Sequence, residues 1–363
     1  MEHLLIIFIM LPAIILIAGT PYFTRKTELF GVSMPEEISN RSDIQAMRKR
    51  YALQTGITIL GLTAILLGAA YLFEGSTDAI LAIGMAAIII ILPFLFYLPA
   101  HKKLTKMKRK EGWFDNKKTE RIIIDTTFHS KKIIHSYSWF LIPGFITITT
   151  ALISMFMYDS LPSSIPTHFD FRGNPDSYSR TTFGTVFLLP TIQFASVLLM
   201  MAVNMSIKKA KQQINAQNPA ESAIQSIAFR RRWSGFIIVT ATFMCILFLL
   251  VQLSMFNLIS SQISIYASFG LTFLLLLYTV YLTIKVGQGG SRIKTGKKAA
   301  TSFSNRDEDE HWKLGLFYWN REDPSIFVEK RFGIGWTCNF AHPIAWISIL
   351  AILLIAFLPL IFM

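Results

Sequence analysis

The sequence predicts an all-α polytopic membrane protein with about eight transmembrane helices plus a small cytoplasmic β-hairpin element. Of its 363 residues, 52% are hydrophobic and only 16% are charged, whereas a soluble domain of this length carries far more polar surface. Apolar runs of about 20 residues, the length that crosses a bilayer as a helix, recur along the chain. The basic residues are confined to alternate segments between these runs.

Eight apolar runs account for the predicted helices, and none of them contains Asp, Glu, Lys, Arg or His. They occupy approximately residues 4–23, 51–73, 79–99, 136–158, 183–206, 233–256, 265–284 and 344–363. One such run also fits a buried core helix, but eight in one chain indicate a multi-pass membrane protein. The first run is preceded by Glu2 and His3 and followed by Arg25 and Lys26, which is typical of a retained helix rather than a cleaved signal peptide.

The basic residues behind the net charge of +13 lie almost entirely in every second segment between the apolar runs. Segments 24–50, 101–135, 207–232 and 285–343 hold 33 of the 35 Lys and Arg residues, and only Arg172 and Arg180 lie on the opposite side. The positive-inside rule places the four basic segments in the cytoplasm and both termini outside the cell membrane. A surface for nucleic acid would not sort its charge in this way, so the expected partner is the lipid bilayer and not a nucleic acid.

The spans lack the residues that intramembrane catalysis requires. An aspartyl protease needs two carboxylates, a serine protease needs a base, and a zinc protease contains H-E-x-x-H, which is absent here. Cys245 and Cys338 fall at different depths and form neither a disulfide framework nor a zinc pair. The sequence therefore predicts a protein that is not an enzyme and that has no cofactor.

Four regions follow from these boundaries. Residues 1–135 hold three spans and two basic loops, 136–206 hold two spans and an extracellular loop, 207–286 hold two spans, and 287–363 hold a linker, a small β module and the last span. The stretch "NPAESAIQSIAFRRRW" predicts a helix that begins at Asn218–Pro219, with Arg230, Arg231, Arg232 and Trp233 as interfacial anchors. The cluster "HKKLTKMKRK" has two interpretations, an orientation anchor and a specific site for acidic lipid headgroups, and the sequence favours the anchor.

The small β module is expected within residues 310–340. Its runs "LFYWN" and "SIFVEK" are separated by a turn at Arg321–Pro324, and a second turn at Gly333–Gly335 precedes "WTCNF". This pattern predicts a hairpin or three-stranded meander that buries Trp312, Trp319 and Trp336. Two roles stay open for it: a structural cap on the helix ends, or a surface for a cytoplasmic protein partner at 310–340.

The candidate site is the extracellular loop "LPSSIPTHFDFRGNPDSYSR", residues 161–180. The residues expected to bind a ligand in this loop are His168, Asp170, Arg172 and Asp176. Three of them would suit a metal or a ligand amine, but the loop offers no further donor or nucleophile, so neither a catalytic residue nor a metal is expected. The remaining alternatives are a structural turn, in which Asp170 accepts backbone amides, and recognition of an extracellular ligand.

The string "LPxxIPTHFDxxGxPDxY" resembles the signature of a bacterial membrane domain of unassigned function, found at the start of SdpI-type immunity proteins. The matching positions are Leu161, Pro162, Ile165, Pro166, Thr167, His168, Phe169, Asp170, Gly173, Pro175, Asp176 and Tyr178. The resemblance covers residues 136–206. Residues 310–346 and 28–51 are similar to a short C-terminal module and a cytoplasmic loop of longer members. In SdpI-type proteins the signature domain comes first, whereas three spans precede it here.

The resemblance implies a non-enzymatic integral membrane protein of the immunity or signalling kind, which protects against or senses an extracellular peptide. The alternative is a transporter or permease subunit. Three amides within the spans, Gln193, Asn204 and Gln252, discriminate between these functions. A continuous amide-lined path favours transport, whereas a packed bundle without such a path favours binding.

Overall fold

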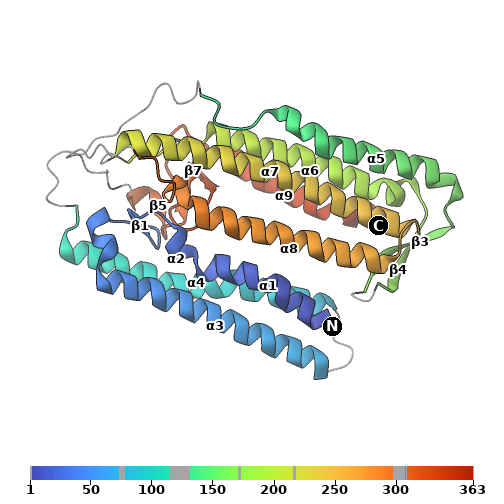
Figure 1. Cartoon of the computed structure of the whole chain (residues 1–363), viewed down its shortest axis with the longest axis horizontal. Coiled ribbons are helices and arrows are strands. Elements are labelled where there is room, and N and C mark those ends of the chain that lie inside the picture. The colour runs from blue at the N-terminus through green and yellow to red at the C-terminus, as the bar shows by residue number, and fades with distance from the viewer. Residues whose placement is uncertain are drawn as a thin grey trace.

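The computed structural model describes residues 2–72, 78–114, 131–170, 173–215, 218–296, 307 and 309–362. It is a bundle of long helices with small β hairpins at its two ends (Figure 1). The long helices are α1 (Glu2–Ala18), α3 (Ser42–Leu72), α4 (Asp78–Glu111), α5 (Leu141–Met157), α6 (Phe183–Lys209), α7 (Pro219–Met255), α8 (Ser261–Val286) and α9 (Pro343–Phe362). Each corresponds to one predicted apolar run, so the helical prediction is confirmed. Six of them, α3 to α8, are long and apolar enough to cross a membrane.

The long helices are joined by short elements. These are α2 (Thr20–Phe23), β1 (Glu28–Leu29), β2 (Val32–Ser33), β3 (Ser164–Phe169), β4 (Pro175–Arg180), β5 (Trp312–Lys313), β6 (Phe317–Tyr318), β7 (Phe327–Glu329) and β8 (Trp336–Cys338), with 3-10 turns at Glu36–Asn40, Tyr137–Phe140, Tyr158–Ser160, Gln288–Gly290 and Asp309–His311. The strands form antiparallel two-stranded units, β1 with β2, β3 with β4, β5 with β6, and β7 with β8, and an isolated parallel bridge joins Tyr318 of β6 to Asn339 after β8.

The helices pack in a continuous series. Helix α4 packs on α3, α3 on α1, α1 on α8 and α8 on α7; α7 packs on α5 and α6, and α9 packs on α6. Helices α4 and α9 therefore lie at the two ends of this series of contacts. Large apolar side chains cover the outer surface, including Phe145 (70% exposed) and Phe156 (80% exposed) on α5. Exposed apolar surface on this scale is typical of helices that face lipid.

The two ends of the bundle differ in composition. The described ends of the chain and the β3–β4 hairpin lie at one end, here called the hairpin end (Figure 1). Hairpin β1–β2 and strands β5 and β7 lie at the other, here called the module end, where residues 309–342 form the module. The described parts of the four basic segments lie at the module end, as their alternation along the chain predicts.

The length of two helices brings them past the membrane core at the module end. Helix α4 has 34 residues and α7 has 37. At about 1.5 Å per residue they reach roughly 50–55 Å, well beyond the ~30 Å hydrocarbon layer of a bilayer. Helix α7 begins at Pro219, the favoured first position, as predicted. The extensions of these two helices form the platform on which the module rests.

The module contains antiparallel hairpins, as predicted, but not a three-stranded meander. The pairing of β7 with β8 across the predicted turn at Gly333–Gly335 is confirmed. The module also has a tight turn at Leu314–Gly315, where both residues have positive φ, so β6 pairs with β5 instead of β7. The predicted turn at Arg321–Pro324 is a longer connection in which the side chains of Asn320 and Asp323 bind backbone N–H groups. The burial of Trp312 is confirmed at 6% exposed, Trp336 is half-buried, and the prediction is wrong for Trp319, which is 41% exposed.

Candidate functional site

The β3–β4 hairpin carries the predicted site and is pinned to the helix ends by its apolar residues. In its register Ile165 faces Ser179 and His168 faces Ser177, with irregularities on either side of His168. Ile165 is fully buried in a cluster with Val186 of α6 and Phe256 after α7. Because side chains alternate along β3, one face of the hairpin packs against the helices and the other face is exposed to solvent.

Asp170 closes the tip of the hairpin. Its Oδ1 accepts the backbone N–H of Asn174 at 2.8 Å, and its Oδ2 accepts the side-chain amide of Asn174 at 3.1 Å. Gly173 has φ +86°, and its carbonyl accepts the hydroxyl of Ser261 at the start of α8. Local bonds of this kind fix a turn. The structure thus gives Asp170 the architectural role that the sequence left open.

His168 and Asp176 form an exposed pair on the open side of the hairpin. His168 Nδ1 lies 2.5 Å from Asp176 Oδ1, and the two side chains are 64% and 45% exposed. The bond spans the two strands and orients both groups. An imidazole and a carboxylate held together can donate and accept hydrogen bonds to a polar ligand.

The four predicted site residues therefore have different positions and contacts. The structure brings His168 and Asp176 together, assigns Asp170 to the turn, and leaves Arg172 outside the described residues. Within the part of the chain that the structure describes, no three His, Cys, Asp or Glu side chains gather in a way that suits a metal ion. Of the predicted site residues, His168 and Asp176 are thus the two that the structure pairs on the exposed side of the hairpin.

A second site, at the module end, was missed by sequence reasoning. Its centre is Glu329 of β7, a fully buried carboxylate that binds both Arg25 and Arg230. Arg230 Nη2 lies 3.4 Å from Glu329 Oε1, and the side chains of both residues are 0% exposed. An unpaired charge at such depth would be costly, so the three side chains depend on one another.

Arg230 also caps the end of α6. Its guanidinium donates to the carbonyls of Ile207 at 2.6 Å, Ala210 at 3.0 Å and Lys211 at 2.9 Å. These carbonyls lie at the negative end of the helix dipole, where a cation is stabilised. The predicted interfacial anchor is therefore wrong for Arg230, because its side chain is enclosed by protein; Arg231 and Arg232 are exposed.

Hydrogen bonds to backbone groups also hold the module at this site. Gln288, just after α8, donates to the carbonyls of Lys330 and Gly335 and accepts the N–H of Gly335 at 2.8 Å. The guanidinium of Arg25 lies against Gly289, where an added Cβ would be 2.2 Å from Nη2. The N–H of Lys211 donates to Phe327 at 2.9 Å. The module thus touches the ends of α6, α7 and α8 together.

Asp323 anchors the other end of the module. Its Oδ2 accepts Lys211 Nζ at 2.8 Å and the Tyr318 hydroxyl at 2.7 Å. Its Oδ1 accepts the N–H of Ser325 at 2.9 Å. Burial opposes ionisation of this carboxyl, but the bonds outweigh burial and lower its pKa to about 2.

A third carboxylate, Asp309, joins the module to α4. It binds Arg331 and Lys108, and it accepts the N–H of Ser33 at 3.1 Å. Burial works against the ionised form, yet the charges of Arg331 and Lys108 hold the pKa of Asp309 below its usual range. Burial raises the pKa of neighbouring Glu28. The module end therefore contains a buried network of acidic and basic groups.

Two turns meet at the face of α4. Phe30–Gly31 in the β1–β2 turn and Leu314–Gly315 in the β5–β6 turn all have positive φ. The Tyr97 hydroxyl lies within hydrogen-bond distance of the carbonyls of Phe30 (3.0 Å) and Leu314 (2.7 Å). The Phe30 ring packs on Tyr51, Tyr97 and Phe332. A bulky residue with positive φ is uncommon, and it is held here by contacts on both its backbone and its side chain.

The amides inside the bundle do not share one environment. Gln193 donates to Cys245 O at 2.8 Å and Thr150 Oγ1 at 3.2 Å, and Gln252 donates to Val186 O at 3.3 Å. Asn204 is 0% exposed, and neither of its side-chain polar atoms has a partner among the described residues. Two of the three amides therefore join helices, and the third remains open to another role.

Comparison with known proteins finds two matches on this chain. Residues 145–194 match the "Domain of unknown function (DUF1648)", and residues 321–346 match the "Family of unknown function (DUF5808)". The first confirms that the segment around the hairpin is a domain of unassigned function, and the second confirms this for part of the module. Comparison with curated proteins and with solved structures gave no match. One domain of unknown function thus carries His168 and Asp176, and the other carries Asp323 and Glu329.

Proposed function

We propose that this chain is a non-enzymatic, multi-pass protein of a bacterial cell membrane, of the immunity or signalling kind, that binds an extracellular peptide at the β3–β4 hairpin. All eight helices cross the membrane in this proposal, with both termini outside. The observation that carries it is the exposed His168–Asp176 pair on a hairpin pinned to α6, α7 and α8. The confinement of 33 of 35 basic residues to alternate segments supports the orientation.

The pair favours recognition because it contributes little to stability. Exposed ion pairs are worth about 0–1 kcal/mol, whereas Asp170 and buried Ile165 already hold the hairpin in place. Polar groups that a rigid scaffold holds in the open are typical of binding surfaces. At the opposite end, exposed Phe317 and Trp319 offer a surface for the cytoplasmic protein partner that the sequence suggests.

The test is growth of a strain in which the gene is deleted, challenged with secreted antibacterial peptides and complemented with variants. We expect the deletion to sensitise cells to at least one peptide and the wild-type gene to restore growth. His168→Ala and Asp176→Ala should fail to restore growth while the protein is present in the membrane at normal level. Asp159→Ala, which removes an exposed carboxylate at the same end, is the control and should restore growth. Full rescue by all three variants would contradict the proposal.

A transporter or permease subunit is the second candidate, and buried Asn204 favours it. A fully buried amide without a partner in the described residues fits the wall of a polar path. Proteoliposomes with purified protein can be tested for swelling in urea, glycerol and small amino acids. Transport would give uptake that Asn204→Leu abolishes and that Gln262→Leu, an exposed amide at the hairpin end, leaves intact. Impermeable proteoliposomes would favour the binding function.

A further inference from the structure

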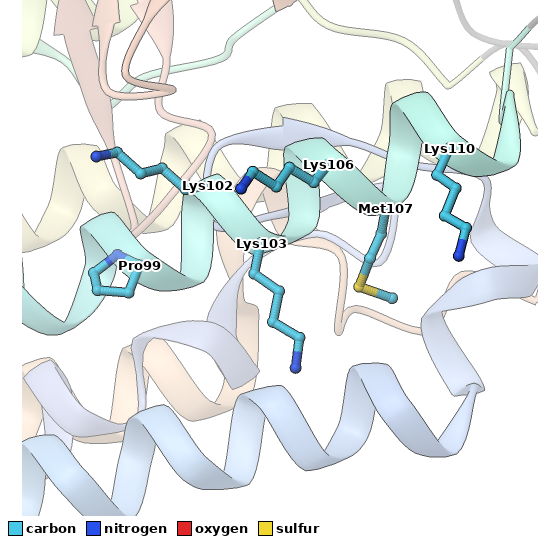
Figure 2. A pocket seen from close by; sticks show the side chains of 6 residues that line it. All are labelled: Pro99, Lys102, Lys103, Lys106, Met107 and Lys110. Carbon is cyan, nitrogen blue, oxygen red and sulfur yellow. The ribbon is translucent and has the colours of Figure 1, made fainter.

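Four lysines follow one face of α4 beyond its apolar part. Figure 2 shows Lys102, Lys103, Lys106 and Lys110 with Pro99 and Met107 along this helix, where they line an open hollow of about 380 Å³. This volume lies at the small end of the ~300–1,000 Å³ range of ligand sites. Pro99 and Met107 add apolar surface between the ammonium groups. We refer to the four side chains as the lysine stripe.

The lysine stripe continues the outer apolar face of α4. Ile91 (52% exposed) and Leu95 (54% exposed) are separated by one turn, and Pro99, Lys102, Lys106 and Lys110 follow at steps of three or four residues. Residues at these steps lie on the same side of a helix. Helix α4 also lies at the end of the packing series, and its extensive packing on another long helix is on α3. The stripe therefore lies on the side of α4 that continues its exposed apolar surface.

The depth of the lysine stripe matches the headgroup layer. The apolar run of α4 ends near Pro99, and Lys102 and Lys106 lie roughly 5 and 10 Å further along the axis at 1.5 Å per residue. Headgroups occupy about 5–8 Å on each side of the hydrocarbon layer. Lysine side chains extend along a surface while keeping their charge in a polar layer. The ammonium groups of Lys102, Lys103 and Lys106 can therefore reach lipid phosphates, whereas Lys110, about 16 Å beyond Pro99, adds positive charge outside the headgroup layer.

Among the residues that the structure describes, no acidic side chain forms an ion pair with this face; Glu111, the nearest carboxylate in the chain, binds Arg41 instead. Within the described residues, ion pairs involve Lys108 on another side of α4, which binds Asp307 and Asp309, but none involves the lysine stripe. Lys102, Lys106 and Lys110 are spaced four residues apart, so their like charges repel along the helix. An anion from outside the protein would relieve this repulsion. On one side of α4 Lys108 is paired with carboxylates, whereas on the other side the described residues give the lysine stripe no ion pair.

We propose that the lysine stripe is a binding site for the phosphate headgroup of anionic phospholipids in the leaflet at the module end. The occupant is a lipid and not a soluble anion, because the apolar face formed by Ile91 and Leu95 leads directly into the stripe and accommodates an acyl chain. The site is independent of the function of the hairpin.

The test uses the full chain purified in mild detergent, with bound lipid measured by native mass spectrometry. Phosphatidylglycerol and phosphatidylcholine are titrated as probes. We expect phosphatidylglycerol to bind at least tenfold more tightly than phosphatidylcholine. Changing the four lysines to Gln should remove most of this preference, and changing them to Arg should retain it. Size-exclusion profiles and helical content show whether each variant is folded.

The matched control removes four other exposed cations at the module end, with Lys49→Gln, Lys294→Gln, Lys313→Gln and Arg321→Gln. Equal loss of lipid preference in this control would overturn the proposal, because it would show attraction by net charge alone. Inorganic phosphate at tens of millimolar is the second arm. Complete displacement of phosphatidylglycerol by phosphate would assign the site to a soluble anion and would also overturn it. Failure of the Arg variant to bind while folded would do the same.

Discussion

Gly31 and Gly315 are in backbone contact, although one lies near the start of the chain and the other near its end. A Cβ on Gly31 would lie 2.4 Å from the carbonyl oxygen of Gly315, and a Cβ on Gly315 would lie 2.7 Å from the Cα of Gly31. Their φ angles are +73° and +69°. Only glycine fits both the conformation and the separation. The contact seats the module on the β1–β2 hairpin.

The first prediction concerns this contact. Gly315→Ala should destabilise the docked module by about 2–4 kcal/mol, because it adds a clash to the strain of a positive φ. Gly296→Ala is the control, since its φ is +71° but nothing lies within 4 Å of the added Cβ. The measurement is the midpoint of thermal unfolding in detergent, together with the rate at which protease releases the module. Equal effects of the two substitutions would show that the contact adds nothing to the backbone strain.

The second prediction concerns the buried carboxylate. Glu329→Gln should destabilise the protein by about 3–5 kcal/mol, because two arginines lose their counter-charge inside the protein. Glu322→Gln, on the exposed surface of the module, should change the unfolding midpoint by little. A double-mutant cycle with Arg25→Gln measures the coupling between Arg25 and Glu329. Additive effects in that cycle would rule out the interaction.

The third prediction is a dependence on acid. The Asp323 pKa of about 2 in the folded protein lies below the unfolded value of about 3.9. Its stabilising contribution is therefore complete above roughly pH 4 and is lost as the pH falls from 4 towards 2. Cleavage of the module by pepsin should accelerate over this interval. Asp323→Asn should be cleaved faster at pH 5 and should show a smaller change between pH 5 and pH 2. Parallel pH profiles for the two proteins would contradict the assignment.

The fourth prediction separates the two acids of the hairpin. Asp170→Ala should reduce the amount of folded protein, because it removes bonds that close the turn and costs about 1–3 kcal/mol. Asp176→Ala should leave abundance unchanged, because its partner His168 is exposed to water. Immunoblots of membranes and fluorescence-detected size exclusion measure both. A larger loss of protein for Asp176→Ala would assign it a structural role.

The fifth prediction tests orientation. Cys245 and Cys338 are first replaced by Ala, and single cysteines are introduced at Ser177 and Glu322, which are exposed at opposite ends. A membrane-impermeant thiol reagent applied to intact cells should label the first, and only permeabilised cells should allow labelling of the second. The reverse pattern would invert the proposed topology.

Sequence predicts the features that depend on neighbouring residues. Each long helix follows from an apolar run, because a chain in lipid must form all of its backbone hydrogen bonds internally. The turn residues Asp170 and Gly173 predict the tip of the hairpin. The pairing of β5 with β6 was missed because it requires Leu314 to adopt positive φ, for which the residue type gives no signal.

The cluster at Glu329 was missed for a different reason. A single Glu within "SIFVEK" is typical of an exposed position on a strand, and "RRRW" is typical of an interfacial anchor. Their meeting depends on how α6, α7 and β7 pack, and no local pattern encodes a contact between residues 99 positions apart. The prediction of function used the charges missing from the spans, whereas the charges that hold the module in place lie just beyond the spans.

The position of Glu329 in the chain has a consequence for biogenesis. Arg230 enters the nascent protein 99 residues before its carboxylate partner, and Arg25 enters 304 residues before it. At about 5–20 residues per second, Arg230 waits roughly 5–20 s during translation before Glu329 is made. The module end therefore closes only after nearly all of the chain has been synthesised, and a product that ends between residues 230 and 329 is left with two unmatched arginines.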